Sequence, residues 1–273
     1  MNKKTKNIII LPYTIWMICF IIVPLLFMIY FGFTNKLNQF TIENILSIFN
    51  QDNLKSLILS LELSLISTII CLIISYPLAL ILKNMNVGKS SFLVFLFILP
   101  MWMNSLLRIV AWLTLLEKKG IINSFLLLLG LPRLDIINTP IAIVLGMVYD
   151  FLPFMILPIY NSLTKIDDNT INAAYDLGAN FFNVLIKIII PLSMPGIISG
   201  ITMVFIPSLT TVAIPNILGG GQILLIGNVI EQEFIQSSNW HRGAGLSIVL
   251  VIFILIITSF VDRHSEKDDK ILM

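Results

Sequence analysis

The sequence predicts an all-α polytopic membrane protein with six transmembrane helices, and two observations support this. Of the 273 residues, 57% are hydrophobic and only 12% are charged, with a mean hydropathy of +0.96, whereas soluble domains carry about 25% charged residues. The apolar residues also form blocks of roughly 20 residues, the length that a helix needs to cross a hydrocarbon core of about 30 Å. A net charge of +2 excludes a mainly electrostatic nucleic-acid binder. We therefore expect the chain to be surrounded by membrane lipid and to have no nucleic-acid partner.

Six apolar blocks are the predicted spans. The first follows three lysines and resembles a signal peptide, but its length and the lack of a small-residue cleavage site favour a retained helix. Each of the next three holds a single charged residue, and the last two hold none. Eight of the twelve prolines fall inside the blocks, which favours a bundle around a path, because bent helices need neighbours or a cavity to satisfy freed backbone groups. The blocks are 8–31, 57–82, 92–116, 141–163, 197–218 and 244–261.

The distribution of lysine and arginine predicts the orientation. With six spans, both termini lie on one side of the membrane. The termini and the loops 83–91 and 164–196 together hold ten of these cations, and the opposite loops hold six. Because loops rich in lysine and arginine stay inside the cell, both termini are expected in the cytoplasm.

The cytoplasmic loop between the fourth and fifth spans is predicted to form two short helices. Asp168 suits the N-cap of a helix over 169–177, and Gly178 suits its C-cap. A second helix over 180–190 is expected to end at Pro191, because proline cannot continue the hydrogen-bond ladder. The two helices would form a compact knob.

The spacing in this loop resembles the EAA loop of ABC-importer permeases, whose pattern is Glu-Ala-Ala-x3-Gly-x9-Ile-x-Leu-Pro. The sequence keeps the spacing and departs from the pattern at Asn172, where glutamate is usual, and at Ile190, where leucine is usual. The resemblance implies that the loop contacts an ATPase. The residues assigned to that contact are Asn172, Ala173, Ala174, Asp176, Gly178, Ile188 and Pro191.

The resemblance covers most of the chain and is closest to the PotB-type permeases of spermidine/putrescine importers. The stretches 151–160, 188–200, 219–221 and 225–230 carry it outside the loop. It implies the type I ABC-importer permease fold. The implied organisation is a first helix with its outer loop over 1–55, a permease core over 56–262 with the coupling loop 165–195, and a cytoplasmic tail over 263–273.

The same resemblance implies a division of labour between several chains. The expected partners are a second homologous permease, two ATPase subunits and an extracytoplasmic solute-binding protein, and the expected solute is a polyamine. No Gly-x4-Gly-Lys-[Ser/Thr] motif occurs in the sequence, so ATP and Mg²⁺ are expected on the partner ATPase and no cofactor on this chain. A different small solute is the main alternative, and a membrane-embedded enzyme or sensor is the weaker one.

The sequence lacks the features expected of a membrane-embedded enzyme or of a sensor. His241 and His264 are isolated from one another and from other metal-ligating residues, so a metal site is not supported. A membrane enzyme would need nucleophile, base or metal ligands gathered at one depth, and no such set is evident. A sensor would need a soluble domain, for which the outer loops are too short.

Asp150 is the main candidate for the solute path, because an ionised acid near the middle of a span is costly and is by default functional. A polycation needs carboxylates to offset lost hydration, and the aromatic faces of Trp102 and Tyr149 would add cation–π attraction. Resemblance adds Thr211, in a part of the fifth span where relatives often carry acids. The alternative is that Asp150 pairs with Arg108 or with a partner subunit, and both possibilities stay open at this point.

Overall fold

The computed structural model describes residues 3–85, 92–93, 95–97 and 99–269. Over these residues the chain is helical, with a lone antiparallel bridge between Thr34 and Phe40. Residues 86–91 of a predicted cytoplasmic loop and 270–273 of the predicted tail lie outside the described residues. The helices are α1 (Lys3–Met17), η1 (Ile18–Ile22), α2 (Val23–Gly32), α3 (Glu43–Leu46), η2 (Ser47–Phe49), α4 (Gln51–Lys83), η3 (Leu99–Trp102), α6 (Ser105–Leu116), α7 (Ile121–Leu128), α8 (Pro140–Leu163), α9 (Asp168–Asp176), α10 (Phe181–Val184), η4 (Leu185–Ile189), α11 (Ile190–Thr210), α12 (Ala213–Leu218), α13 (Ile226–Ile235) and α14 (Trp240–Asp269).

Five of the predicted spans appear as helices long and apolar enough to cross a membrane. They are Ile10–Gly32, Gln51–Lys83, Pro140–Leu163, Phe181–Thr210 and Trp240–Ser259. A sixth is present if the bent pair Phe95–Trp102 and Ser105–Leu128 is counted as one span. The all-helical multi-span prediction is therefore confirmed.

The third span is not the continuous helix that 92–116 predicted. Its two parts meet at an angle of 99°. Pro100 has no N–H to donate to a helical ladder, and Asn104 starts a new helix by accepting a hydrogen bond from the Leu106 amide at 2.9 Å. A proline followed by a good N-cap residue thus replaces one helix by a 3-10 turn, a break and α6.

The fifth span is shifted toward its N-terminus relative to the predicted 197–218. The helix runs from Phe181 to Thr210, and a break at Thr211 and Val212 separates it from α12. Pro215 explains the break, because its ring would clash with the carbonyl of Thr211 in a continuous helix and it offers that carbonyl no N–H.

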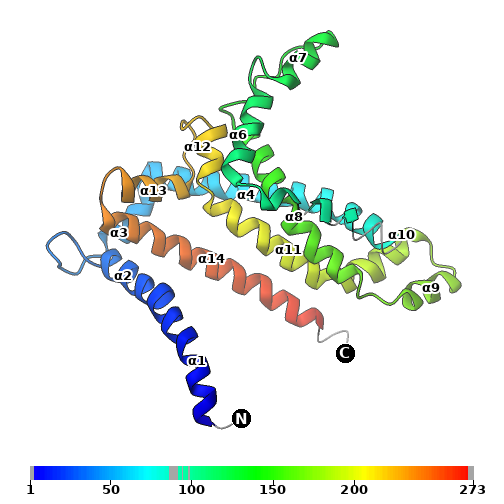
Figure 1. Cartoon of the computed structure of the whole chain (residues 1–273), viewed down its shortest axis with the longest axis horizontal. Coiled ribbons are helices and arrows are strands. Elements are labelled where there is room, and N and C mark those ends of the chain that lie inside the picture. Colours follow the sequence, from blue (N-terminus) through cyan, green and yellow to red (C-terminus); the bar gives the residue numbers. More distant parts are fainter. Residues whose placement is uncertain (1–2, 86–91, 94, 98, 270–273) are drawn as a thin grey trace. The chain divides into compact units, whose positions relative to one another are not determined.

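The chain forms two compact units, Met1–Lys55 with Val229–Ile256, and Ser56–Asn228 with Ile257–Met273. In the second unit α8 and α11 lie side by side (Figure 1). Gly196 and Gly200, spaced four apart on α11, allow this, because a Cβ at Gly196 would stand 2.6 Å from the Pro158 carbonyl oxygen of α8. Small residues at this spacing let membrane helices approach closely. Gly196 and Gly200 therefore set the short distance between α8 and α11.

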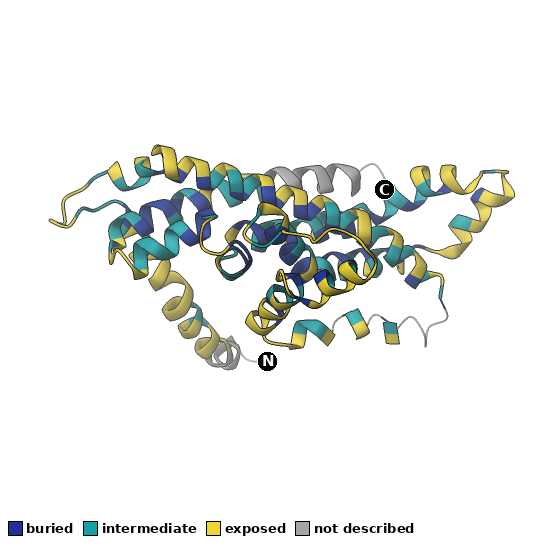
Figure 2. Ribbon diagram, turned by 90° about the horizontal axis from the view of Figure 1, so that it is seen from above, coloured by how far each residue is buried: buried dark blue, intermediate teal, exposed yellow. Residues whose placement is uncertain are grey.

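The first unit joins the ends of its two spans. The Asn44 side chain donates to the Gly32 and Thr34 carbonyls at 3.2 and 2.8 Å, and His241 Nδ1 lies 3.2 Å from the Phe31 carbonyl oxygen. Little else covers the first span, since only 6% of its most apolar window is buried and its described residues are almost wholly exposed (Figure 2). Lipid or a partner chain must cover this apolar helix in the membrane.

Candidate coupling surface and solute path

The loop helix α9 has well-formed ends. Its N-cap is Asp167, whose side chain accepts from the Asn169 amide at 3.0 Å, so the prediction of Asp168 was one residue late. Asp168 instead makes an ion pair with Lys83 at 3.1 Å, which ties the start of α9 to the end of α4.

Gly178 caps the other end of α9, as predicted. Its φ is +82°, the Gly178 amide donates to the Tyr175 carbonyl at 2.9 Å and the Ala179 amide to the Ala174 carbonyl at 3.1 Å. This pair of bonds is a Schellman motif, in which the left-handed residue is usually glycine because other residues pay a Cβ penalty. The turn therefore has a fixed shape and reverses the chain from α9 into α10.

The second loop helix does not end at Pro191, contrary to the prediction. The chain stays helical from Phe181 to Thr210, and a five-residue π-helical segment, η4, precedes the proline. A π segment changes the register of the backbone hydrogen bonds. Such a change gives new donors to the carbonyls that a proline, which has no N–H, leaves without one. The loop is thus continuous with the fifth span, and Ile188 lies within the π segment.

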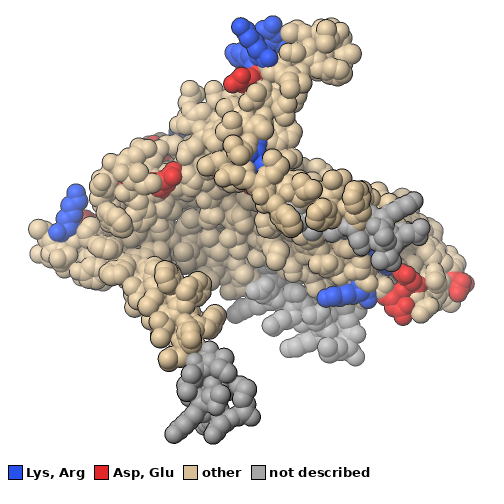
Figure 3. Space-filling model, viewed as in Figure 1, with Lys and Arg blue, Asp and Glu red and all other residues tan. Residues whose placement is uncertain are grey.

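The assigned coupling residues are distributed over α9, its cap, the π segment and the first turn of α11, which holds Pro191. Ala174 is buried, whereas Asn172, Ala173, Asp176 and Gly178 are exposed. Large apolar side chains are also exposed around the cap: Leu177 at 89%, Phe182 at 69% and Ile186 at 61%. Exposed apolar side chains around a polar helix, at the end of the fifth span, are typical of a protein contact surface. Figure 3 shows Asp and Glu side chains at this end of the unit on an otherwise mostly uncharged face.

Asp150 is buried in α8 and pairs with Arg108 of α6. The Arg108 Nη2 and Asp150 Oδ1 atoms are 2.6 Å apart, and the two side chains are 8% and 13% exposed. Arg108 Nη1 also donates to the Pro100 carbonyl at 2.9 Å, so one guanidinium connects the broken third span to the fourth. The Arg108 Nε atom has no hydrogen-bond partner among the described residues.

The aromatic candidates lie near this pair in different ways. Tyr149 packs edge-on against Trp112 with ring centroids 5.2 Å apart. Trp112 lies one turn after Arg108 on α6. Trp102 ends the 3-10 turn η3 with its side chain 77% exposed, and its ring lies edge-on to Phe95. The structure therefore connects Asp150 and Tyr149 to α6 and places Trp102 on the turn that Arg108 holds.

Thr211 lies in the break between α11 and α12. Buried Asn228 holds this break by donating to the Val212 carbonyl at 3.0 Å and to Asn216 Oδ1 at 2.7 Å. A Cβ at Gly227 would stand 2.8 Å from the Thr210 carbonyl oxygen, so only glycine permits this approach. Irregular backbone at membrane depth occurs where it is buried in protein or lines a cavity, and here the Asn228 side chain supplies a donor for the Val212 carbonyl freed at the break.

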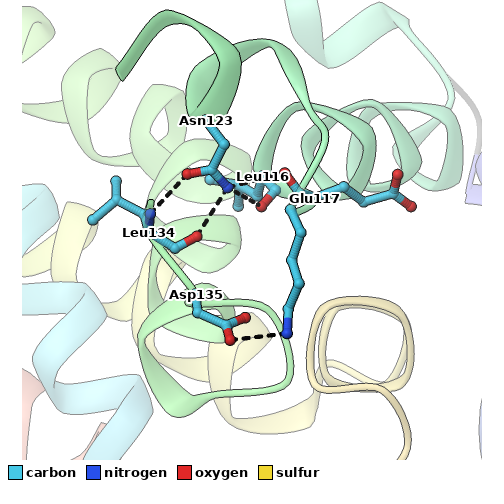
Figure 4. A network of polar contacts seen from close by, with 6 residues as sticks. Leu116, Glu117, Asn123, Leu134 and Asp135 are labelled. Carbon is cyan, nitrogen blue, oxygen red and sulfur yellow. Dashed lines mark hydrogen bonds and ion pairs between the residues drawn. The ribbon is translucent and has the colours of Figure 1, made fainter. Parts of the chain in front are cut away.

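Asn123 organises the loop between α6 and α8 (Figure 4). Its amide donates to the Glu117 and Leu134 carbonyls at 3.0 and 2.9 Å, and its Oδ1 accepts from the Leu134 amide at 2.7 Å. An ion pair between Lys118 and Asp135 at 3.0 Å closes the same hairpin. Neither Asn123 nor Asn228 was among the predicted functional residues. The available signal was a carboxamide inside an apolar run, which must find partners when buried.

The described residues contain no group of three or more His, Cys, Asp or Glu able to hold a metal ion.

Comparison with known proteins gives one family and several close relatives. Residues 75–265 match the family described as "binding-protein-dependent transport system inner membrane component". The spermidine/putrescine transport system permease protein PotB of Haemophilus influenzae is 38% identical, covering 97% of this chain and 96% of that protein. The protein of that name from Escherichia coli K12 is 38% identical over 87% of this chain and 89% of its own.

Two further matches widen the comparison. The inner membrane ABC transporter permease protein YdcU of Escherichia coli K12 is 29% identical over 84% of this chain and 78% of that protein. Among solved structures, a chain of the bacterial alginate ABC transporter in complex with alginate pentasaccharide-bound periplasmic protein superposes with a TM-score of 0.81, at 16% identity, covering 96% of this chain and 94% of that one. At that identity the likeness shows the fold, which is that of an ABC-importer permease.

Proposed function

Because the chain belongs to the family of inner membrane components of binding-protein-dependent transport systems, we propose that it is the permease through which a polyamine, spermidine or putrescine, is imported. The observation that carries the solute class is 37–38% identity, over at least 87% of this chain, with permeases named for that transport. The family membership makes the chain a transport subunit of the cell membrane and not an enzyme.

Other subunits would supply solute capture and ATP hydrolysis. Family membership implies a binding protein and other ABC components. The arrangement we propose has a second homologous permease, two ATPase subunits that hold ATP and Mg²⁺, and both termini of this chain in the cytoplasm. The absence of a Walker A motif from the sequence supports placing nucleotide on another chain.

Coupling to the ATPase would pass through the knob formed by α9, its cap and α10. The continuous helix Phe181–Thr210 supports this role, because a helix without an interruption transmits displacement as a lever. Closure of the ATPases would move the knob, and the breaks at residues 103–104 and 211–212 would let the spans switch the path between inward-facing and outward-facing states.

The solute path would pass Asp150, Tyr149, Trp102 and Thr211. Asp150 already holds an internal cation, Arg108, so a solute ammonium would share or take over that carboxylate. The same pair favours the second candidate, an importer of the same class for a different small solute, because a paired carboxylate places no demand on a cationic cargo.

The deciding experiment compares uptake of labelled spermidine and putrescine in a strain that lacks other polyamine carriers, with and without this chain and its partners. We expect uptake that depends on the chain and that excess unlabelled polyamine suppresses. Equal uptake in the two strains would refute the solute assignment while leaving the importer class intact.

The coupling surface has its own test. Gly178→Trp adds bulk at an exposed turn where a Cβ would meet nothing within 4 Å, and it also strains the left-handed backbone at φ +82°. A matched variant that tolerates this backbone separates the two effects. We expect loss of ATPase co-purification, whereas Gly178→Asn, which tolerates a left-handed backbone, retains it. Full transport and co-purification by both variants would contradict the proposed contact.

A further inference from the structure

The two spans of the first unit end at the same level. The apolar runs are Ile10–Gly32 and Trp240–Ser259, and at 1.5 Å per residue each is long enough to cross a hydrocarbon core of about 30 Å. Their ends touch, because His241 Nδ1 is 3.2 Å from the Phe31 carbonyl oxygen and the rings of Phe31 and Trp240 have centroids 6.3 Å apart. This contact therefore marks one end of both spans, where the lipid headgroups are expected.

A hollow of about 520 Å³ opens at this level. It is lined by Phe31, Lys36, Ser238, Asn239, Trp240 and His241. Ser238 has a φ of +49°, which turns the chain sharply out of the loop before α14. All of these residues belong to the same compact unit, so the hollow does not depend on where the other unit lies.

The lining combines a cation with aromatic walls. Lys36 is exposed and makes no ion pair with any described residue. The Phe31 ring contacts the rings of both Trp240 and His241, the latter edge-on with centroids 5.3 Å apart. An ammonium beside aromatic rings at the end of a span suits an anionic headgroup whose glycerol and first methylenes rest on apolar surface.

The loop that carries Lys36 favours a lipid over a soluble anion. Leu37 and Phe40, in the same loop as Lys36, are 76% and 74% exposed. The loop presents them in a defined shape, because the Leu37 and Gln39 amides both donate to Asn35 Oδ1 at 2.9 Å and Phe40 stacks on Phe33 at 5.8 Å. Large apolar side chains held outward at headgroup level are stabilised by acyl chains and have no use in binding a small ion.

We infer that this hollow binds the phosphodiester headgroup of a phospholipid, with Lys36 contacting the phosphate and with Trp240, Leu37 and Phe40 against the upper part of the acyl chains. This lipid would stabilise the junction at which the first and last helices of the unit meet. The inference is independent of the transported solute.

Native mass spectrometry of the detergent-purified complex, titrated with phosphatidylglycerol, tests the site. Lys36→Gln should keep the loop intact, because the Lys36 side chain is exposed and makes no ion pair within the described part of the chain. We expect about a fivefold loss of lipid retention, the factor that corresponds to about 1 kcal/mol per lysine near a lipid phosphate. The matched control is Lys119→Gln, which removes another exposed lysine from a loop of the other unit and should leave retention unchanged.

Two further arms identify the ligand. Dioleoylglycerol, which has the acyl chains without the phosphate, should bind more weakly than phosphatidylglycerol in the wild-type complex and equally in the wild type and Lys36→Gln. Inorganic phosphate at millimolar concentration should fail to displace the lipid. Equal retention by Lys36→Gln and Lys119→Gln, equal binding of the two lipids by the wild type, or displacement by phosphate would each overturn the proposal.

Discussion

The Arg108–Asp150 pair gives the sharpest prediction, because both partners are buried and a single contact of 2.6 Å joins them. Removing one partner of a buried pair leaves an uncompensated charge, at a cost of about 3–5 kcal/mol. Insertion scales give a similar figure, about 2.5–3.5 kcal/mol, for a lone charge at a helix centre. We therefore expect Asp150→Leu and Arg108→Met each to lower the free energy of unfolding by about 3 kcal/mol or more.

The double variant should be far less damaging than the sum of the single variants. With both charges gone, what remains is mainly the lost hydrogen bond from Arg108 to the Pro100 carbonyl, at a cost of about 1–2 kcal/mol. The coupling energy of the cycle should thus reach at least about 3 kcal/mol. Equilibrium unfolding of the purified chain in mixed SDS micelles measures all four members of the cycle. Additivity of the single variants within about 0.5 kcal/mol, the behaviour of independent sites, would refute the ion pair as described.

Three other predictions rest on the backbone. Gly196→Ala should destabilise the α8–α11 contact by about 1–3 kcal/mol, because its Cβ would stand 2.6 Å from the Pro158 carbonyl oxygen; unfolding in SDS checks this, and Ser199→Ala on the exposed face is the control. Gly178→Ala should speed amide exchange in α9 by about tenfold, since the left-handed backbone at φ +82° costs an alanine about 1–2 kcal/mol, and unchanged exchange would contradict the cap. Asn123→Ala removes hydrogen bonds at 3.0, 2.9 and 2.7 Å, worth about 2–4 kcal/mol together, so residues 117–135 should become sensitive to protease while Ser124→Ala stays resistant.

Hydrophobic composition was enough to predict the spans, since the bilayer imposes a length and a polarity that sequence shows directly. Four spans lie near their predicted bounds and the Gly178 cap is present as predicted, because each depends on neighbours in sequence. The breaks at residues 103–104 and 211–212 were missed although Pro100, Asn104 and Pro215 announce them. Proline inside a membrane helix either bends it or breaks it, and which occurs depends on whether other groups satisfy the freed carbonyls.

Pro191 shows the same ambiguity in the opposite direction. The sequence predicted a helix end there, and the chain instead continues through a π-helical segment into the fifth span. A helix end and a π-helical segment each remove the clash between the proline ring and the preceding turn. The residues next to Pro191 therefore did not show which of the two would occur. The packing of α11 against α8 favours the continuous helix.

By itself, the sequence determined that the chain is a membrane protein with about six spans. It also determined that a capped helix lies between the fourth and fifth spans and that the sequence carries no Walker A motif. These features depend on composition, on spacing along one helix and on short motifs. Only the tertiary structure decided that Asp150 is paired with Arg108, that Asn123 and Asn228 hold a loop and a break, and that Gly196 and Gly200 bring two helices together. These contacts join different helices or the two arms of a loop, and the partner of a buried polar or small residue is set by packing in three dimensions.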